Sequence, residues 1–251
     1  MHSVLVYHSI SCPIEPLEAD ADISPERFQQ QLQWLSRWRR VVPLEETLRA
    51  TPRRSVAITF DDGYRDNLTV ALPLLEKFHL PMTLFVAAGF VGRAGYLTKE
   101  DLREISAHPL ITIGAHGLWH RPFNRLTVSE ARFELIESRR LLSEIIGKTV
   151  DLLAWPYGEC NEMLELLSEE CGYRASWSVW QGTNSTHSRW RVPLGRHDNL
   201  ARFVIKASGF YALTKARWHR YSERTEVRGQ RSEVRDQRSE VNDQVSLHAD
   251  F

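Results

Sequence analysis

Two adjacent carboxylates follow an apolar run in residues 56–63, Val-Ala-Ile-Thr-Phe-Asp-Asp-Gly. The apolar part is typical of a buried β-strand, and Gly63 allows the sharp turn that would follow it. Asp61 and Asp62 are therefore expected at the carboxyl end of a strand, the edge at which α/β folds bind their ligands. Acid-acid-glycine is also a common turn sequence, so the pair needs support from other segments.

Two histidines stand at the end of a second strand-like segment, residues 111–120, Ile-Thr-Ile-Gly-Ala-His-Gly-Leu-Trp-His. If the strand turned directly into a helix, His116 and His120 would share one face and supply two nitrogen ligands to one ion. With a carboxylate from another strand end they would form the two-histidine, one-carboxylate set that leaves coordination positions open for water and substrate.

A third segment, Pro156-Tyr157-Gly158, follows an apolar strand at 150–153. Proline and glycine impose a defined loop whose backbone N–H groups can face a reacting oxygen. An ordinary turn is the alternative for this segment alone. Three polar motifs at three strand ends together indicate a site.

The elements that must position these motifs alternate between strands and helices along most of the chain. Ser24-Pro25-Glu26 opens a helix, and Thr127 and Glu130 form a possible capping box for the longest one, which Gly147 ends. This alternation predicts an α/β fold, barrel-like or doubly wound. The expected strands are 3–10 (which would deliver His8 to a strand end), 56–60, 82–86, 110–114, 150–155 and 173–179; the expected helices are 25–38, 68–78, 101–105, 127–146 and 162–170.

Composition excludes several classes of function. The 251 residues carry 32 basic and 32 acidic side chains, so no net field would attract nucleic acid or an anionic membrane. No window approaches the roughly 18 apolar residues of a membrane span, and no signal peptide is recognisable, so we expect a cytoplasmic protein. Three cysteines argue against a disulfide framework. Cys160, close to the third motif, is read as a small buried hydrophobe, with a reactive role as the alternative.

The last thirty residues differ in character. Residues 226–232, 233–239 and 240–246 repeat a seven-residue pattern with only one regularly apolar position, whereas a coiled coil needs two. We expect a solvated, disordered or loosely helical tail over 222–251, with an oligomerisation helix as the alternative. Residues 1–221 would then form one domain, with a catalytic core at about 54–210.

The three motifs resemble those of the polysaccharide deacetylases, or NodB-homology enzymes, of carbohydrate esterase family four. Thr59-Phe60-Asp61-Asp62-Gly63, His116-Gly-Leu-Trp-His120 and Pro156-Tyr157-Gly158 match in order and spacing, and Tyr7-His8 is similar to one branch of the family. The resemblance covers roughly 4–210 and implies an irregular (β/α) barrel of about seven strands.

It also implies roles for individual residues. Asp62, His116 and His120 would hold one divalent metal ion, usually zinc, and Asp61 would be the general base. The chemistry agrees, because a carboxylate bound to a cation loses proton affinity and its free neighbour is the better base. The backbone N–H of Tyr157 would complete an oxyanion site, and Pro156 and His8 are candidate substrate contacts. For His8 a core or hydrogen-bonded histidine is the favoured alternative.

The chain departs from the family pattern at three points. The third motif has no arginine to orient the base, and Arg196 is a candidate substitute. The late histidine that protonates the leaving amine is represented by His197, with spacing off by one; a structural histidine is the alternative. Trp177 or Trp180 could stack on a sugar ring, although burial in the core is the alternative for either.

The resemblance implies a hydrolase of carbon–nitrogen bonds other than peptide bonds, one that removes an N-acetyl group from an N-acetylated sugar or glycan. The alternatives are the same metal site acting on a non-sugar amide, and a degenerate carbohydrate-binding homologue without turnover. The sequence does not indicate an oligomeric state.

Overall fold

The computed structural model of the chain describes residues 2–11, 20–49 and 54–211. The predicted tail at 222–251, its boundary at 221, and Cys12 lie outside these residues.

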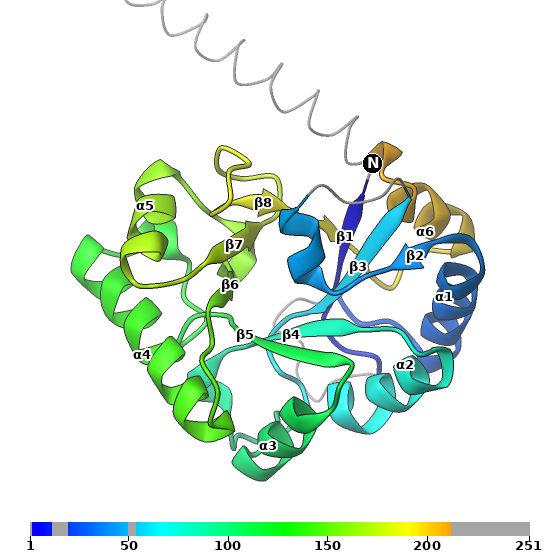
Figure 1. Cartoon of the computed structure of the whole chain (residues 1–251), viewed down its shortest axis with the longest axis horizontal. Helices are drawn as coiled ribbons and strands as arrows, with labels where there is room; N and C mark the ends of the chain where they lie inside the picture. Colours follow the sequence, from blue (N-terminus) through cyan, green and yellow to red (C-terminus); the bar gives the residue numbers. More distant parts are fainter. Residues whose placement is uncertain (1, 12–19, 50–53, 212–251) are drawn as a thin grey trace, which may run out of the picture. The chain divides into compact units, whose positions relative to one another are not determined.

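The sheet is parallel throughout and curls into a nearly closed barrel (Figure 1). Along the sheet the strand order is β8-β7-β6-β5-β4-β3-β1-β9, and the short β2 (Arg40–Val41) pairs with the start of β3. The strands are β1 (Ser3–Tyr7), β3 (Ser55–Phe60), β4 (Met82–Val86), β5 (Ile111–Ala115), β6 (Leu152–Ala154), β7 (Ala175–Ser178), β8 (Arg189–Trp190) and β9 (Val192–Pro193).

One extended segment closes the barrel. β8 pairs with β7 and β9 pairs with β1, and only Arg191 separates β8 from β9. The chain therefore changes partner at Arg191, and β8 and β9 together fill the seventh strand position beside β1, β3, β4, β5, β6 and β7. The predicted (β/α) barrel of about seven strands is confirmed.

Helices surround the sheet on its outer side (Figure 1). They are α1 (Pro25–Trp38), α2 (Leu72–Phe78), α3 (Lys99–Ala107), α4 (Val128–Ile146), α5 (Glu162–Glu170) and α6 (Leu200–Ala207). The Ser24 cap and the Thr127–Glu130 capping box are present as predicted, and Gly147 ends α4 in the left-handed region. Sequence reasoning missed α6 and also missed that α2 is preceded by a π-helical turn, Asn67–Ala71. Short 3₁₀ turns lie at Leu44–Leu48, Ala88–Phe90, Phe123–Arg125 and Pro156–Gly158.

Strand alternation divides the core in two. Leu5, Ile58 and Leu84 belong to a large cluster that includes residues of the helices, whereas their neighbours Ala57 and Phe85 belong to a second cluster inside the barrel. Trp177 lies in this inner cluster, fully buried, with its ring centroid 5.9 Å from that of Phe85. The predicted sugar contact by Trp177 is therefore wrong, because its position on β7 points the indole into the barrel interior.

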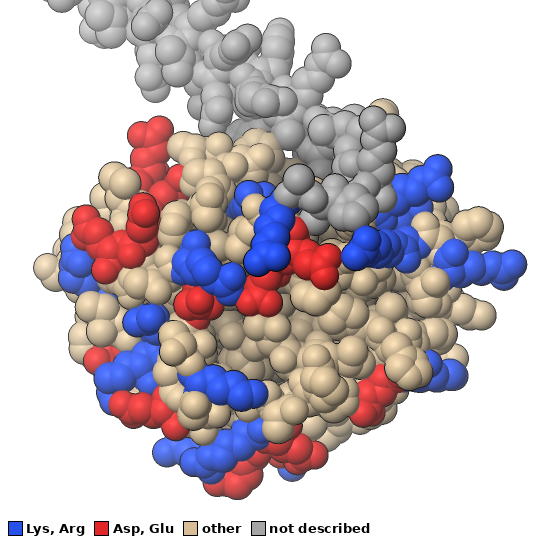
Figure 2. All heavy atoms as spheres, in the orientation of Figure 1, with Lys and Arg blue, Asp and Glu red and all other residues tan. Residues whose placement is uncertain are grey.

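Positive and negative side chains are interspersed on the face shown in Figure 2, as the balanced composition leads one to expect. Within the described residues, no helix combines the length and the apolar character needed to cross a bilayer.

Candidate active site

Asp61 and Asp62 follow β3 in a tight turn. Asp62 has a φ of 73° and Gly63 a φ of 83°, and a Cβ on Gly63 would lie 2.9 Å from a methyl group of Val86 on the neighbouring strand. Glycine is thus required at 63 by both conformation and space. The turn buries both carboxylates, with Asp61 3% and Asp62 1% exposed.

His116 and His120 reach the same place from the loop after β5. The predicted helical arrangement of this pair is wrong, because residues 116–120 form an irregular loop and His120 has a φ of 52°. This left-handed turn, rather than helical spacing, brings the two ring centroids to 4.9 Å. Both side chains are buried.

The ligand atoms of Asp62, His116 and His120 converge, all lying within 4.8 Å of one another. Asp62 Oδ1 is 3.2 Å from His120 Nε2 and 3.5 Å from His116 Nε2. Ligands bound at about 2.0–2.1 Å in a tetrahedral site are about 3.3 Å apart, so this spacing suits zinc. Asp62 Oδ1 is buried and has no hydrogen bond of acceptable geometry among the described residues. A cation would satisfy this atom.

The protonation states also suit a metal. His116 Nδ1 lies 2.8 Å from the backbone oxygen of Ala154, which fixes Nδ1–H as the donor and leaves Nε2 as the ligand atom. Burial lowers the pKa of His116 to about 4, against the opposing effect of Asp61. Burial opposes ionisation of Asp62, but its electrostatic interactions with His120, His8 and His116 outweigh that effect and hold the pKa of Asp62 well below its usual range. Neutral imidazole and ionised carboxylate are the forms that bind metal.

Asp61 is paired with Arg191, a residue that the sequence analysis missed. The guanidinium donates from Nη1 and Nη2 to the two carboxylate oxygens, both at 2.7 Å, and Arg191 is fully buried. Nη1 is also 3.3 Å from Thr59 Oγ1, and the guanidinium carbon lies 5.3 Å from the ring centroid of Phe85. Burial opposes the charged form of Asp61, but Arg191 and then His116 outweigh it and hold the pKa of Asp61 below its usual range.

Arg196 and His197, the late residues predicted to serve the site, contact acidic side chains other than Asp61 and Asp62. Arg196 donates to Asp22 Oδ1 at 2.9 and 2.6 Å and is 42% exposed at its side chain. The His197 side chain is 73% exposed, and its Nε2 lies 3.5 Å from Asp20 Oδ1. Both follow β9, but past its end, where the chain has already left the barrel wall.

His8 follows β1 at the same strand edge as the two carboxylates, because Tyr7 pairs with Phe60. It is 8% exposed, and its charge contributes to lowering the pKa of both Asp61 and Asp62. Asn67 Nδ2 donates to the His8 backbone oxygen at 2.9 Å, and Asp66 Oδ2 accepts from the backbone N–H of residues 10 and 11. The π-helical turn thus holds the loop that carries His8, consistent with the frequent occurrence of π-turns at functional sites.

Tyr157 lies beside His120, with ring centroids 4.6 Å apart. Tyr157 has a φ of 58° in the 3₁₀ turn Pro156–Gly158, so the turn is strained. Asp62, His120 and Tyr157 therefore all adopt left-handed backbone conformations at one place, and such conformations are typical of functional sites. Pro156 is buried at the start of the turn.

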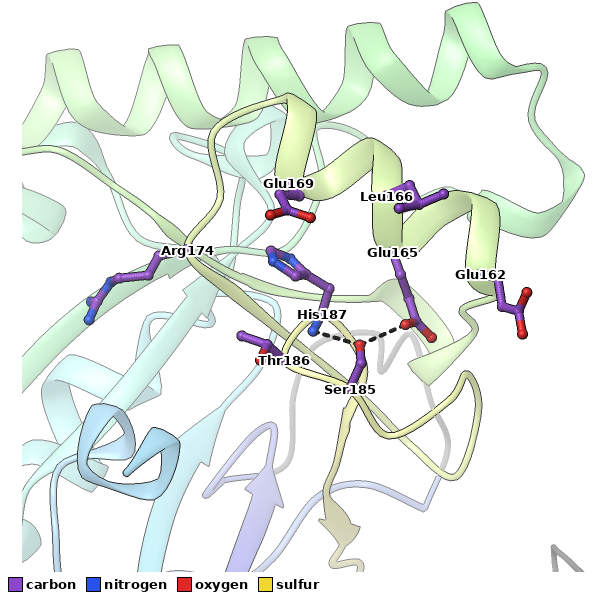
Figure 3. Close-up of a pocket in the computed structure, with 8 residues that line it drawn as sticks. All are labelled: Glu162, Glu165, Leu166, Glu169, Arg174, Ser185, Thr186 and His187. Atoms are coloured by element: carbon purple, nitrogen blue, oxygen red, sulfur yellow. Dashed lines mark hydrogen bonds between the residues drawn. The ribbon is translucent and has the colours of Figure 1, made fainter. Parts of the chain in front are cut away.

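A separate pocket of about 590 Å³ lies between α5 and the segment before β8 (Figure 3). Its carboxylate Glu165 accepts hydrogen bonds from Thr183 and Ser185, so it serves to hold that segment. None of the predicted site residues lines this pocket. Cys160 is a buried free thiol whose pKa burial raises to well above its usual range, as a structural cysteine requires.

The parallel barrel carries an acid pair, two histidines and a strained turn at the carboxyl ends of β3, β5 and β6, the face at which barrel enzymes place their active sites. The sequence model of the polysaccharide deacetylase family matches residues 48–176, slightly more than half of the chain. The chain belongs to this family of enzymes, and the predicted enzyme class is confirmed at that level.

Individual proteins similar to this chain are also polysaccharide deacetylases by name. The chain is 29% identical over 189 residues to YxkH of Bacillus subtilis, which is named for the same family; the match covers 72% of this chain and 66% of YxkH. It is 26% identical over 223 residues to the poly-β-1,6-N-acetyl-D-glucosamine N-deacetylase of Staphylococcus aureus strain COL, over 81% of this chain and 74% of that enzyme. The deacetylase PplD of Streptococcus pyogenes, solved with acetate, superposes with a TM-score of 0.72 at 21% identity, covering 82% of this chain and 97% of PplD. This last likeness supports the fold alone.

Proposed function

We propose that the protein is a metal-dependent deacetylase that removes an N-acetyl group from an N-acetylated sugar or glycan. The observation that carries the proposal is the buried convergence of Asp62, His116 and His120 next to the Asp61–Arg191 pair. A named relative that deacetylates poly-β-1,6-N-acetyl-D-glucosamine supports the substrate class.

Asp62, His116 and His120 would hold the ion through one carboxylate oxygen and two Nε2 atoms. We propose zinc, because the donor set and the close spacing suit it. The bound ion would polarise the acyl carbonyl and lower the pKa of water to about 7. The Ala154 carbonyl keeps His116 in the tautomer that this role requires.

Asp61 is the proposed general base, which takes the proton from the attacking water. Arg191 keeps Asp61 ionised and holds both oxygens in fixed positions through two parallel hydrogen bonds. The oxygen that forms the new bond comes from water, and the carbon–nitrogen bond then breaks. The amine that leaves needs a proton.

His8 is the proposed donor of that proton, in place of His197. It lies at the same strand edge as Asp61 and Asp62, whereas His197 is exposed beside Asp20. The strained turn at Tyr157 is proposed to aim its backbone N–H at the acyl oxygen, where a preorganised donor stabilises developing charge. Pro156 shapes that turn.

The same metal site acting on a non-sugar amide remains the alternative activity. The degenerate homologue is less well supported than the sequence suggested, because Arg191 makes the contact with Asp61 that the missing third-motif arginine was expected to make. An intact charged pair next to an intact ligand set is expected of a working enzyme.

Acetate release from N-acetylglucosamine oligomers tests the proposal. Release should stop on treatment with a chelator and return when zinc is added back. Binding of the oligomer without release by the zinc-loaded protein would favour the binding homologue, and neither binding nor release would favour the non-sugar amide.

A further inference from the structure

Glu134 is a carboxylate of α4 to which the proposed reaction gives no role. Its side chain lies on the buried face of the helix and is 1% exposed. Burying a carboxylate is unfavourable unless hydrogen bonds satisfy it. Its Oε2 atom accepts the backbone N–H groups of Leu118 and Trp119, at 2.8 and 2.9 Å. Because both residues stand between His116 and His120, Glu134 binds the loop that carries the two proposed histidine ligands.

The same loop is held from a second side by the turn after β4. The backbone N–H groups of Ala88 and Gly89 donate to the carbonyl oxygens of Gly117 and Leu118, at 3.1 and 2.8 Å. Ala88 and Gly89 belong to a short 3₁₀ turn. The loop thus donates hydrogen bonds to α4 and accepts hydrogen bonds from the turn, so its backbone is fixed between the two.

The backbone conformation of this loop requires such support. Gly117 and His120 have φ values of 71° and 52°, in the left-handed region. For a residue with a side chain this conformation is unfavourable, and it persists where the surrounding contacts fix it. The hydrogen bonds to Glu134 end at Trp119, directly before His120. They therefore hold the backbone at the point from which the His120 side chain projects toward the other ligands.

We propose that Glu134 is a positioning residue for the metal site, whose carboxylate fixes the loop so that both imidazoles face Asp62 before an ion binds. This inference rests on the metal site of the proposed function. Side chains of a functional site bind best when the residues around them hold them in the productive geometry. The expected consequence is a zinc affinity that depends on a residue outside the ligand set.

Zinc affinity, measured by competition with a chelator, tests this role. Glu134→Met keeps much of the side-chain volume but removes the acceptor, so the zinc dissociation constant should rise about 10- to 100-fold. Glu134→Gln keeps a carbonyl oxygen that can accept both N–H groups, and it should recover most of the affinity. Recovery by an uncharged amide separates the effect of the hydrogen bonds from the attraction between a carboxylate and the cation.

Glu165→Met is the matched control. Glu165 is also a nearly buried glutamate on a helix, and its carboxylate accepts the backbone N–H of Thr183 in another loop at 2.7 Å. Both methionine variants should lose unfolding free energy, but only Glu134→Met should lose zinc affinity. The proposal would be overturned by wild-type zinc affinity in Glu134→Met, by an equal loss in Glu134→Gln, or by an equal loss in Glu165→Met.

Hydrogen exchange in the wild-type protein decides the question if Glu134→Met does not fold. The amide hydrogens of Leu118 and Trp119 should exchange slowly in the zinc-free protein, because their hydrogen bonds to Glu134 form without the ion. Rapid exchange of both until zinc is added would show that the ion orders the loop, and it would refute the positioning role.

The proposed function has a separate outcome in these measurements. A wild-type protein that binds zinc and releases acetate, beside a Glu134→Met variant with full zinc affinity, would refute the role of Glu134 alone. A wild-type protein that binds zinc with an affinity dependent on Glu134, but releases no acetate, would retain the positioning role and refute the deacetylase. A wild-type protein that binds no zinc would refute both.

Discussion

Replacing Arg191 by methionine removes the guanidinium while keeping much of the side-chain volume, and it leaves the Asp61 carboxylate buried without its partner. Asp61 and Arg191 have side chains 4% and 0% exposed and share two hydrogen bonds of 2.7 Å. Breaking a buried pair from one side costs about 3–5 kcal/mol of unfolding free energy, because the remaining charge stays desolvated. We expect a loss of this size at neutral pH by urea denaturation.

The pH dependence of the loss has a defined sign. In the wild type the pKa of Asp61 lies below its ordinary value of 3.8, so its contribution to stability is present above 3.8 and is lost as the pH falls through the folded value. Without Arg191, burial dominates and raises the pKa of Asp61. As the pH falls through this raised pKa, Asp61 becomes protonated in the folded variant while it is still ionised in the unfolded chain. Proton uptake by the folded state stabilises it, so the loss of unfolding free energy relative to the wild type becomes smaller. The acid limb of kcat should move to higher pH for the same reason.

Arg174→Met is the matched control. Arg174 also contacts carboxylates, those of Asp151 and Glu45, but its side chain is 47% exposed, so the expected cost is below about 1 kcal/mol. The double variant Asp61→Asn/Arg191→Met should recover part of the stability lost in Arg191→Met. The assignment of Arg191 as the partner that keeps Asp61 ionised would be refuted by two results together. These are a loss of unfolding free energy in Arg191→Met no larger than that in Arg174→Met, and an acid limb of the pH–kcat profile that stays at the wild-type pH.

Two further predictions concern the remaining roles. Asp61→Asn should retain close to one equivalent of zinc while kcat falls about 10²–10⁴-fold, whereas His116→Ala should lose the zinc itself. Metal analysis combined with an acetate-release assay distinguishes the two variants. Equal zinc content and equal rates in both variants would contradict the division of roles. His8→Gln should lower kcat by about 10²-fold or more, whereas His197→Gln should leave kcat unchanged. The reverse result would return the proton donor to His197.

Local sequence determined much of this protein. The caps at Ser24 and Thr127 fixed where α1 and α4 begin. Apolar runs located six strands, β1 and β3 to β7, but not β2, β8 or β9. Both signals are local, because hydrogen-bonding side chains and side-chain periodicity act over a few residues. The positions of Asp61, Asp62, His116 and His120 at strand ends followed from the same runs, since parallel strands present their carboxyl ends at one edge. The convergence of Asp62, His116 and His120 could thus be predicted from the sequence. The left-handed backbone conformations of Asp62 and His120 could not.

Tertiary structure decided the partner of Asp61. Arg191 is 130 residues away along the chain, and nothing in its type or immediate neighbours distinguishes it from Arg196. The difference arises when β9 pairs with β1 and β8 with β7. Barrel closure places Arg191 at the point of exchange, with its side chain turned into the interior, while Arg196 has passed the strand end and meets Asp22 at the surface. Strand register is set by the packing of the whole barrel. The local sequence around Arg191 and Arg196 therefore does not determine which of the two pairs with Asp61.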